Sequence, residues 1–295
     1  MVEPNPKPDR LRQCLRLVGL SGLPKTSGFI WWVDRRLPVS DAVFEVDFFG
    51  HRYEGCLNQK IDKSVWYFGV YEPAELNLIK GILNEVRRQG EERIVLLDIG
   101  ANVGHHSLFL SSYADQIIAF EPAIEASEKL RARMAKNQIA NVTLYNVALG
   151  EADSSGFLGS GFDGNSGSRS LLWTFDPEKN EKVIVRHADA FMAEINCPKI
   201  HVIKMDVEGF EKTVLTGLRN KIAADRPIIL FEMVGNQTRG GFEGIEDLHS
   251  TVLGDCTLFG VHGRTKPFLR DYVWEDDAVL LVPNEKLSLI QSFRQ

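Results

Sequence analysis

Hydrophobic and polar positions change their period along the chain, which separates a β-like beginning from a region of alternating strands and helices. Val43–Phe48 alternates apolar and polar residues, and Gly50 begins a turn before a partner strand over Arg52–Leu57. The whole stretch from Phe29 to Trp66 is rich in aromatic and β-branched residues and is predicted to be β-structure.

The next pattern is helical and runs from Pro73 to Gly90. Proline suits the first helical turn, and glycine suits the position just past the last one. Leu76 and Ile79 fall on one face of this helix. Residues 1–90 are therefore expected to form an α+β extension, a hairpin plus a helix, that covers the cleft of the domain over residues 91–295.

After Gly90, short apolar runs alternate with helical segments. The main predicted strands cover Arg93–Asp98, Gln116–Phe120, Val142–Leu149, Ile200–Asp206, Pro227–Glu232, Cys256–Val261 and Asp277–Val282. The helices between them cover His105–Tyr113, Ile124–Asn137 and Glu208–Leu218. This alternation predicts an α/β fold with a doubly wound, mostly parallel, seven-stranded sheet and right-handed crossovers. Two Gly-rich stretches, residues 153–170 and 235–244, are predicted to be loops.

The segment VLLDIGANVG joins the first of these strands to its helix. The strand ends at Asp98, Gly100 lets the backbone turn and approach a ligand closely, and Gly104 lets the helix pack near the strand end. Free N–H groups of the helix then face the crevice and suit an anionic group such as a carboxylate. A dinucleotide fingerprint would need glycines where Asn102 and His105 stand, so a ligand without a pyrophosphate is favoured.

Acidic residues follow later strands at the same rim. Glu121 stands about 20 residues beyond the glycine turn, where a carboxylate can accept hydrogen bonds from ribose hydroxyls. The alternative for Glu121 is a carboxylate at a helix N-terminus. Asp206 and Glu208 end another strand, with helix capping ahead of Gly209 as their alternative role. His105 opens the first helix and is either a proton acceptor or a packing residue.

Five motifs, taken together, resemble the FkbM-type methyltransferases: DIGANVG, FEP, NVALG, IKMDVEG and ILFE, within a region from about Trp66 to Glu232. The resemblance implies a Rossmann-like fold that uses S-adenosylmethionine, commonly to methylate hydroxyl groups of small molecules or sugars. Asp98, Gly100, Asn102 and Gly104 would then form the methionine side of the pocket.

The same resemblance places further residues around the cofactor. Glu121 would hold the ribose, and the backbone of Ala148 would contact the adenine edge with Asn146 nearby. Glu72, in the motif YEP, belongs to an element that packs over the cofactor cleft in the family. Asp206 is a further candidate for cofactor binding.

A hydroxyl nucleophile must lose its proton as it attacks the methyl group. Asp206, Glu208 and His105 are the candidate general bases. Three other functions remain open at this point: N-methylation, a non-catalytic module that binds S-adenosylmethionine, and a metal hydrolase that uses the carboxylates of Asp206, Glu208 and Glu232. No metal site is predicted.

The composition limits which kinds of partner and which location are expected for this protein. The 295 residues carry a net charge of −6, with no basic excess across the domain, which disfavours a nucleic acid partner. No run of 18 apolar residues and no signal-peptide pattern occurs, so a cytoplasmic enzyme without a transmembrane segment is expected. Four cysteines without a C-x-x-C pair are predicted to be unpaired thiols. Aromatic residues near the beginning are expected to line the core, a substrate pocket or a homodimer face.

Overall fold

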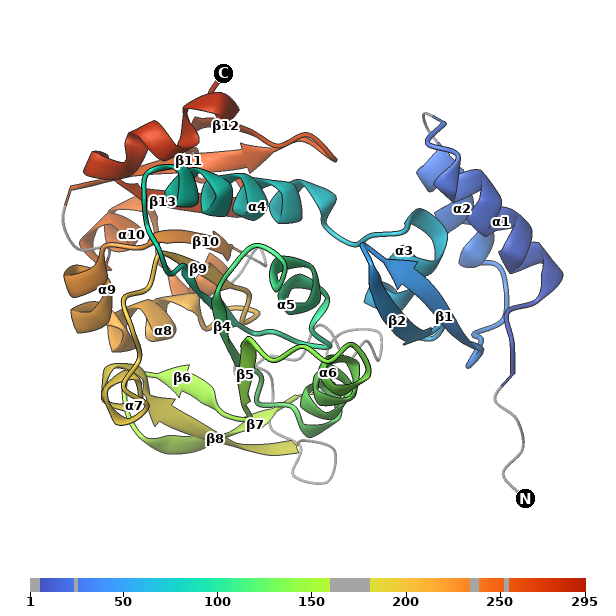
Figure 1. The fold of residues 1–295 in the computed structure, drawn as a ribbon, viewed down its shortest axis with the longest axis horizontal. Helices are drawn as coiled ribbons and strands as arrows, with labels where there is room; N and C mark the ends of the chain where they lie inside the picture. Colours follow the sequence, from blue (N-terminus) through green and yellow to red (C-terminus); the bar gives the residue numbers. More distant parts are fainter. Residues whose placement is uncertain (1–5, 24–25, 160–180, 234–238, 252–254) are drawn as a thin grey trace. The chain divides into compact units, whose positions relative to one another are not determined.

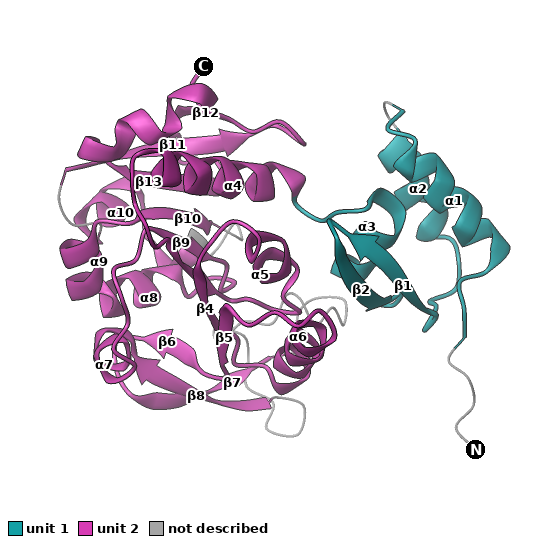
Figure 2. Ribbon diagram, in the orientation of Figure 1, with its two compact units in different colours: residues 1–72, 165–167 teal, residues 73–164, 168–295 magenta. Residues whose placement is uncertain are grey.

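The computed structural model describes residues 6–23, 26–159, 181–233, 239–251 and 255–295. It divides into two compact units, one formed mainly by residues 1–72 and the other mainly by residues 73–295 (Figure 2). The boundary between the two units therefore lies at Pro73, whereas the sequence predicted a domain boundary at residue 90. Within the described residues, the helices are too short or too polar to cross a membrane.

The smaller unit combines a hairpin with three helices. Its elements are α1 (Arg10–Leu20), α2 (Thr26–Asp34), β1 (Val43–Phe48), β2 (His51–Cys56) and α3 (Lys60–Phe68). The hairpin is confirmed with antiparallel pairing between β1 and β2. The prediction of β-structure from Phe29 to Trp66 is wrong over α2 and α3, where the chain is helical and buries Ile30 of α2 and Val65 of α3 in the unit.

Buried acids hold this unit together. Asp34 accepts hydrogen bonds from the Tyr67 hydroxyl at 2.8 Å and from Lys63 at 2.7 Å. Asp62 accepts one from the Tyr53 hydroxyl at 2.7 Å. A Cβ at Gly19 would lie 2.1 Å from the Tyr67 carbonyl oxygen, so glycine allows α1 to approach α3 closely.

The larger unit is built on an eight-stranded sheet, one strand more than the sequence predicted. In spatial order its strands are β12 (Phe268–Asp271), β11 (Cys256–His262), β13 (Ala278–Pro283), β10 (Ile228–Glu232), β9 (Val202–Met205), β3 (Val95–Ile99), β4 (Gln116–Phe120) and β5 (Val142–Tyr145). The strands from β10 to β5 run parallel, and β13 pairs with β10 antiparallel. The predicted doubly wound α/β fold is confirmed. The extra strand, β12, pairs with β11 and forms the edge of the sheet.

Helices cover both faces of this sheet (Figure 1). They are α4 (Pro73–Arg88), α5 (His105–Leu110), α6 (Ile124–Lys136), α7 (Ala188–Glu194), α8 (Glu211–Gly217), α9 (Arg219–Asp225) and α10 (Ile245–Thr251), with 3₁₀ turns η3 (Arg239–Gly241) and η4 (Asn284–Phe293). The chain moves outward from β3 to β4 and β5 by way of α5 and α6, and from β9 to β10 in the opposite direction by way of α8 and α9. The strand order therefore reverses between β3 and β9, which is where doubly wound sheets bind ligands.

A second sheet of three strands accounts for two errors in the sequence-based prediction. It contains β6 (Ala148–Gly150), β8 (Glu181–His187) and β7 (Ser154–Leu158) in that spatial order. The single strand predicted over Val142–Leu149 is split between the two sheets, because the chain turns at Asn146. The loop predicted from residue 153 includes β7, and its part from residue 160 on lies outside the described residues, as do residues 235–238 of the second predicted loop.

Side chains of both faces of the parallel strands form the core. Leu97, Ile203 and Phe231 are fully or almost fully buried on neighbouring strands. Such continuous apolar runs are expected of parallel strands covered on two faces. The four cysteines are free thiols, as predicted: Cys14, Cys56, Cys197 and Cys256.

Candidate cofactor and active site

The loop after β3 lies directly against the end of β9. Gly100 has a φ of 78°, in the left-handed region, and a Cβ there would lie 1.8 Å from the carbonyl oxygen of Asp206. The Asp206 N–H in turn donates to the Ile99 carbonyl at 2.9 Å. Glycine is therefore required at position 100 for both conformation and space. The structure brings together the two segments that the sequence placed at one rim.

The second glycine of the loop allows α5 and α6 to pack together. Gly104 has a φ of 82°, and a Cβ there would lie 2.2 Å from a methyl carbon of Leu130 on α6. Arg133 from the same helix donates to the Val103 carbonyl at 2.6 Å. Gly104 therefore permits a close approach between the loop and α6, whereas the prediction had assigned it to packing of the following helix near the strand end.

Glu121 connects the ends of β3 and β4. Its carboxylate accepts hydrogen bonds from the backbone N–H groups of Asn102 and Ala123, both at 2.8 Å. The side chain is buried, and this burial raises its pKa to about 7 against the two hydrogen bonds. Glu121 therefore has the helix N-terminal role that was its alternative, because Ala123 directly precedes α6. Each oxygen keeps a second acceptor site, so the predicted ribose contact stays chemically open.

Asp98 is completely buried at the end of β3. One carboxylate oxygen accepts a hydrogen bond from the Ser107 hydroxyl at 2.5 Å. The other, Oδ1, lies 3.9 Å from the Lys204 ammonium and has no hydrogen-bond partner among the described residues. Burial raises the pKa of Asp98, and the charge of Lys204 opposes that shift. A buried acceptor of this kind is costly unless a donor satisfies it.

Asp206 and Glu208 follow β9 at the same place. Lys204 lies 3.5 Å from Asp206 Oδ2, while the buried Oδ1 of Asp206 has no hydrogen-bond partner among the described residues. Glu208 is half-buried and has a φ of 53°, an uncommon backbone conformation for a residue with a side chain. Such conformations cluster at functional sites.

The helix-capping role considered for Asp206 and Glu208 is not observed, since the N-cap position of α8 is Phe210, which makes no side-chain capping hydrogen bond. Glu211, at the beginning of α8, accepts hydrogen bonds from the N–H groups of Val207 and Gly209 at 3.2 and 3.3 Å. Its burial raises its pKa to about 7. The alternative reading for Asp206 and Glu208 was therefore wrong, because α8 begins three residues after Glu208 rather than at it.

Two histidines and an unforeseen acid complete this edge. His105 and His106 are buried at the beginning of α5, with ring centroids 4.1 Å apart. Burial lowers the pKa of both well below the usual value, with the charge of Lys204 adding to the effect. Glu75 of α4 is also buried, and its carboxylate lies 4.0 Å from Nε2 of His106.

Glu75 was missed because α4 was interpreted as a packing helix. Burial raises its pKa, the charge of Lys204 opposes the shift, and the charge of Asp206 adds to it. The available signal was an acid in the first turn, two residues after Pro73. Six carboxyl groups now gather at this edge with Lys204 and Arg133: Glu75, Asp98, Glu121, Asp206, Glu211 and Glu232.

Asn146, Ala148 and Glu72 are the other residues predicted to contact the cofactor. The Asn146 amide donates to the carbonyls of Glu121 and Pro122 at 2.8 and 2.9 Å and so holds the turn after β4. Ala148 is buried and begins β6, where it pairs with Val185. Glu72 belongs to the smaller unit and has a φ of 48° directly before α4. Their cofactor contacts stay predictions.

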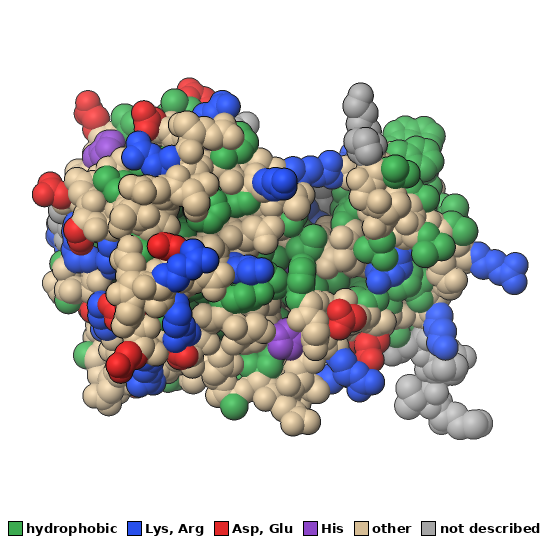
Figure 3. Space-filling model, turned by 45° about the horizontal axis from the view of Figure 1, so that its top comes forward, with side chains coloured by type: hydrophobic (Ala, Val, Ile, Leu, Met, Phe, Trp, Pro, Cys, Tyr) green, Lys and Arg blue, Asp and Glu red, His purple; other side chains and the backbone are tan. Residues whose placement is uncertain are grey.

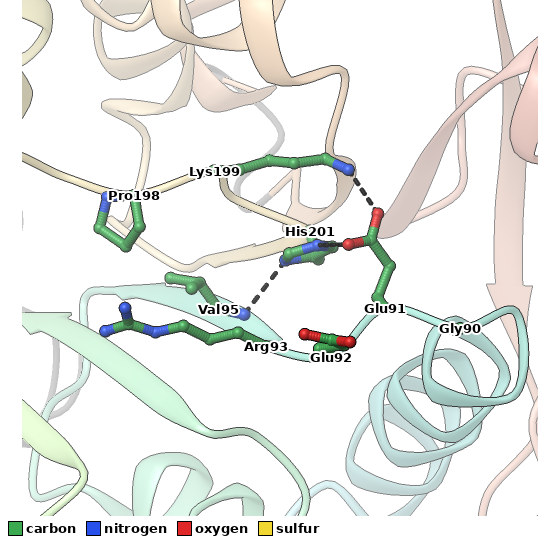
Figure 4. A pocket seen from close by; sticks show the side chains of 8 residues that line it. All are labelled: Gly90, Glu91, Glu92, Arg93, Val95, Pro198, Lys199 and His201. Carbon is green, nitrogen blue, oxygen red and sulfur yellow. Dashed lines mark hydrogen bonds and ion pairs between the residues drawn. The ribbon is translucent and has the colours of Figure 1, made fainter.

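The opposite edge of the same strands carries a hollow of about 410 Å³ (Figure 4). Glu91 forms an ion pair with Lys199, and its Oε2 lies 3.3 Å from Nε2 of His201. Nδ1 of His201 accepts a hydrogen bond from the Val95 N–H at 3.1 Å, so Nε2 carries the proton in the neutral ring. This hollow lies at the amino ends of β3 and β9, away from the switch-point edge.

Comparisons with known proteins agree with the geometry. Residues 98–271 match the model of the methyltransferase FkbM domain. Hexuronic acid methyltransferase AglP of Haloferax volcanii is 28% identical over 156 residues, 53% of this chain and 61% of that protein. Methyltransferase 1 of Beauveria bassiana is 26% identical, over 42% of this chain and 57% of that protein. The chain thus spans about 60% of the length of these relatives.

Among solved structures, the methyltransferase FkbM from Methylobacillus flagellatus KT has 16% identity and a TM-score of 0.42, over 75% of this chain and 66% of that one. The doubly wound sheet and its glycine loop define a Rossmann-like protein with a switch-point site. The family model matches more than half of the chain and identifies the particular family. This chain belongs to the FkbM methyltransferase family.

Proposed function

We propose that this chain transfers a methyl group from S-adenosylmethionine to a hydroxyl group of a small molecule or a sugar. The observation that carries the proposal is the contact of the Gly100 loop with the end of β9, which leaves buried acceptors of Asp98 and Asp206 without hydrogen-bond partners among the described residues. A sugar acceptor is supported by the printed function of AglP, a hexuronic acid methyltransferase.

The residues present fit such a cofactor. The Oδ1 atoms of Asp98 and Asp206 offer acceptors to an ammonium group, and Glu121 keeps acceptor capacity for two ribose hydroxyls. The acidic surroundings also favour a ligand with a sulfonium charge, because a cation lowers the cost of ionising buried carboxyl groups. Asn102 and Gly104 would line the methionine side. When bound, the cofactor supplies an activated methyl group.

The protein's own contribution is alignment and a base. The acceptor hydroxyl must give up its proton as the new carbon–oxygen bond forms. Asp206 and Glu208 are partly accessible, whereas His105 is buried and its pKa is well below the usual value. We therefore assign the proton to Asp206 or Glu208, with His105 as a packing residue beside them.

Calorimetry and product analysis test the proposal in sequence. Well-folded protein should take up S-adenosylmethionine and its demethylated product, and should convert a hexuronic acid or a related sugar into a methyl ether in a mass-spectrometric assay. No uptake of either compound would remove the function. A methyl ester in place of an ether would overturn hydroxyl methylation, because a carboxylate nucleophile needs no base.

Three variants separate the catalytic candidates: Asp206→Asn, Glu208→Gln and His105→Ala. Loss of a catalytic base lowers kcat by about 10²–10⁴ with the cofactor affinity largely kept. We expect this for Glu208→Gln, whereas Asp206→Asn should also weaken cofactor binding, because Asp206 Oδ1 is assigned to the ammonium group. Glu92→Gln, an exposed acid at the opposite edge, is the matched control. Normal turnover in all three variants would eliminate this assignment.

A further inference from the structure

Exposed apolar side chains concentrate at the beginning of the chain. Among the described residues, thirteen large hydrophobic side chains are exposed, and eight of them lie in residues 6–40. Leu17 is 72% exposed, and Phe29 and Trp32 are each 55% exposed. Scattered exposed hydrophobic residues are ordinary, but a group of this kind within 35 residues marks an interaction surface.

Positive charge concentrates in the same segment. Residues 6–40 contain seven Lys or Arg and two Asp, a net charge of +5, in a chain whose net charge is −6. The remaining 260 residues therefore carry −11. Both Asp residues are used inside the unit: Asp9 accepts from the Arg12 N–H at 2.9 Å, and Asp34 is buried. The outward charge of the segment is thus mainly positive.

The fold of the smaller unit does not need the exposed side chains. Helix α1 buries Leu15 and Arg12 against the unit, whereas Leu17 and Leu20 point outward. Helix α2 buries Ile30 and Asp34, and presents Phe29 and Trp32.

The exposed aromatic rings are arranged together with basic side chains. Phe29 and Trp32 are stacked with ring centroids 6.4 Å apart, and the Arg36 guanidinium lies 3.8 Å from the Trp32 ring centroid. Figure 3 shows hydrophobic side chains gathered over the smaller unit with Lys and Arg side chains beside them. The α1–α2 face is defined here as the side chains of Leu17, Leu20, Phe29, Trp32, Arg10 and Arg35.

We propose that the α1–α2 face binds an anionic membrane surface, with both helices lying in the interfacial plane. Leucine and aromatic side chains would enter the boundary between head groups and acyl chains, and the arginines would pair with anionic head groups. Helix α1 has eleven residues, a length of about 16 Å, which is too short to span a bilayer and sufficient to lie on one. The net charge of +5 in residues 6–40 is complementary to a negatively charged membrane surface.

Vesicle sedimentation with the full chain tests this proposal. The protein should bind vesicles of phosphatidylcholine with about a third phosphatidylserine, and should bind phosphatidylcholine alone at least tenfold more weakly. Binding should weaken as salt rises from 0.05 to 0.5 M, because the interaction with the head groups is screened. Tryptophan fluorescence should shift to shorter wavelength when Trp32 enters the boundary region.

Paired variants separate the two contributions. Leu17→Ser with Phe29→Ser should weaken binding by roughly tenfold or more. Ile184→Ser with Val273→Ser, at exposed positions of the larger unit, is the control and should leave binding unchanged. Arg10→Glu with Arg35→Glu should weaken binding by roughly thirtyfold. Arg264→Glu with Lys266→Glu changes the net charge by the same amount at another exposed site and should have a much smaller effect.

Three outcomes would overturn the proposal. The first is the absence of binding to anionic vesicles by a protein whose circular dichroism and melting are those of a folded chain. The second is equal binding to neutral and anionic vesicles. The third is a dimer in sedimentation analysis that Leu17→Ser with Phe29→Ser dissociates, without vesicle binding by the parent chain, which would assign the face to a second copy.

Discussion

Acidic and basic side chains lie at both ends of strands β3 and β9. They are solvent-exposed at the amino ends, called the amino edge here, and buried at the carboxyl ends, called the carboxyl edge. At the amino edge, Lys199 and Glu91 form an ion pair in which both side chains are about half exposed, and hydrogen bonding to Lys199 lowers the pKa of Glu91. At the carboxyl edge, Lys204 and Asp98 are buried, and burial raises the pKa of Asp98. Solvent thus stabilises the charges at one edge and is excluded from the other.

This difference explains why the visible hollow is not the candidate active site. The hollow of about 410 Å³ lies at the amino edge, where Glu91 is paired with Lys199 (Figure 4). The carboxyl edge holds a surplus of buried carboxyl groups, and three of their oxygens, on Asp98, Asp206 and Glu211, have no hydrogen-bond partner among the described residues. Groups with pKa values perturbed by desolvation are typical of functional sites.

Substitution of the two lysines should give the largest contrast. Lys204→Met removes a positive charge beside buried Asp98 and Asp206, and should lower the free energy of unfolding by about 3 kcal/mol. Lys199→Met removes an exposed pair and should cost less than about 1 kcal/mol. Urea denaturation at neutral pH measures both. Equal losses would show that burial does not distinguish the two edges.

Alanine at two glycines tests the backbone at each edge. Both Gly100 and Gly90 have positive φ, but a Cβ at position 100 meets the Asp206 carbonyl oxygen at 1.8 Å, whereas a Cβ at position 90 meets nothing within 4 Å. Gly90→Ala should cost about 1 kcal/mol for the left-handed conformation alone. Gly100→Ala should cost roughly 2–3 kcal/mol, and should also abolish cofactor binding in calorimetry. A Gly100→Ala variant with full affinity would contradict the site.

The sequence predicted the parts of the larger unit whose signals are local. Apolar runs ending at Asp98, Phe120 and Glu232 mark buried parallel strands, and the glycine spacing identified the turn that the structure confirms. The acid in the first turn of α4 was the local signal for Glu75, but its burial depends on how α4 packs, which the pattern of an ordinary amphipathic helix does not reveal.

Non-local pairing accounts for the other failures. Val142–Leu149 is one apolar stretch in the sequence, yet its halves pair with β4 and β8 in different sheets. The amide of Asn146 fixes the turn between those halves through carbonyls of another loop. In the smaller unit, α2 resembles a strand in composition, and its helical state follows from packing of Ile30 and Asp34 against the rest of the unit.

Glu121→Gln compares the two edges through their effect on cofactor affinity. This prediction depends on the proposed function. Glutamine removes the negative charge and one of two acceptor oxygens at a carboxylate that already binds two backbone N–H groups. The affinity for S-adenosylmethionine should fall by about tenfold or more. Glu91→Gln at the amino edge is the control and should leave the affinity unchanged. An unaltered affinity in Glu121→Gln would remove the ribose contact.

The smallest expected effect is a difference in pH dependence between the two edges. The pKa of Glu211 is raised from 4.5 to about 7 by burial, so the folded state binds its proton more tightly than the unfolded state does. The stability from this group is present below pH 4.5 and is lost as pH rises towards 7. Between pH 6 and 8 the free energy of unfolding should therefore fall by about 1 kcal/mol because of Glu211.

Glu211→Gln keeps an acceptor for the Val207 and Gly209 N–H groups and removes the titration, so its stability should fall less over that range. The pKa of Glu91 is shifted in the opposite direction from that of Glu211. Its pKa is lowered, and its contribution is present above about pH 4.5 and lost only as pH falls through the folded-state value. Glu91→Gln should therefore leave the slope between pH 6 and 8 unchanged. Urea denaturation at pH 6, 7 and 8 measures the slopes, and parallel curves for the parent chain and Glu211→Gln would show that the carboxyl edge is as well solvated as the amino edge.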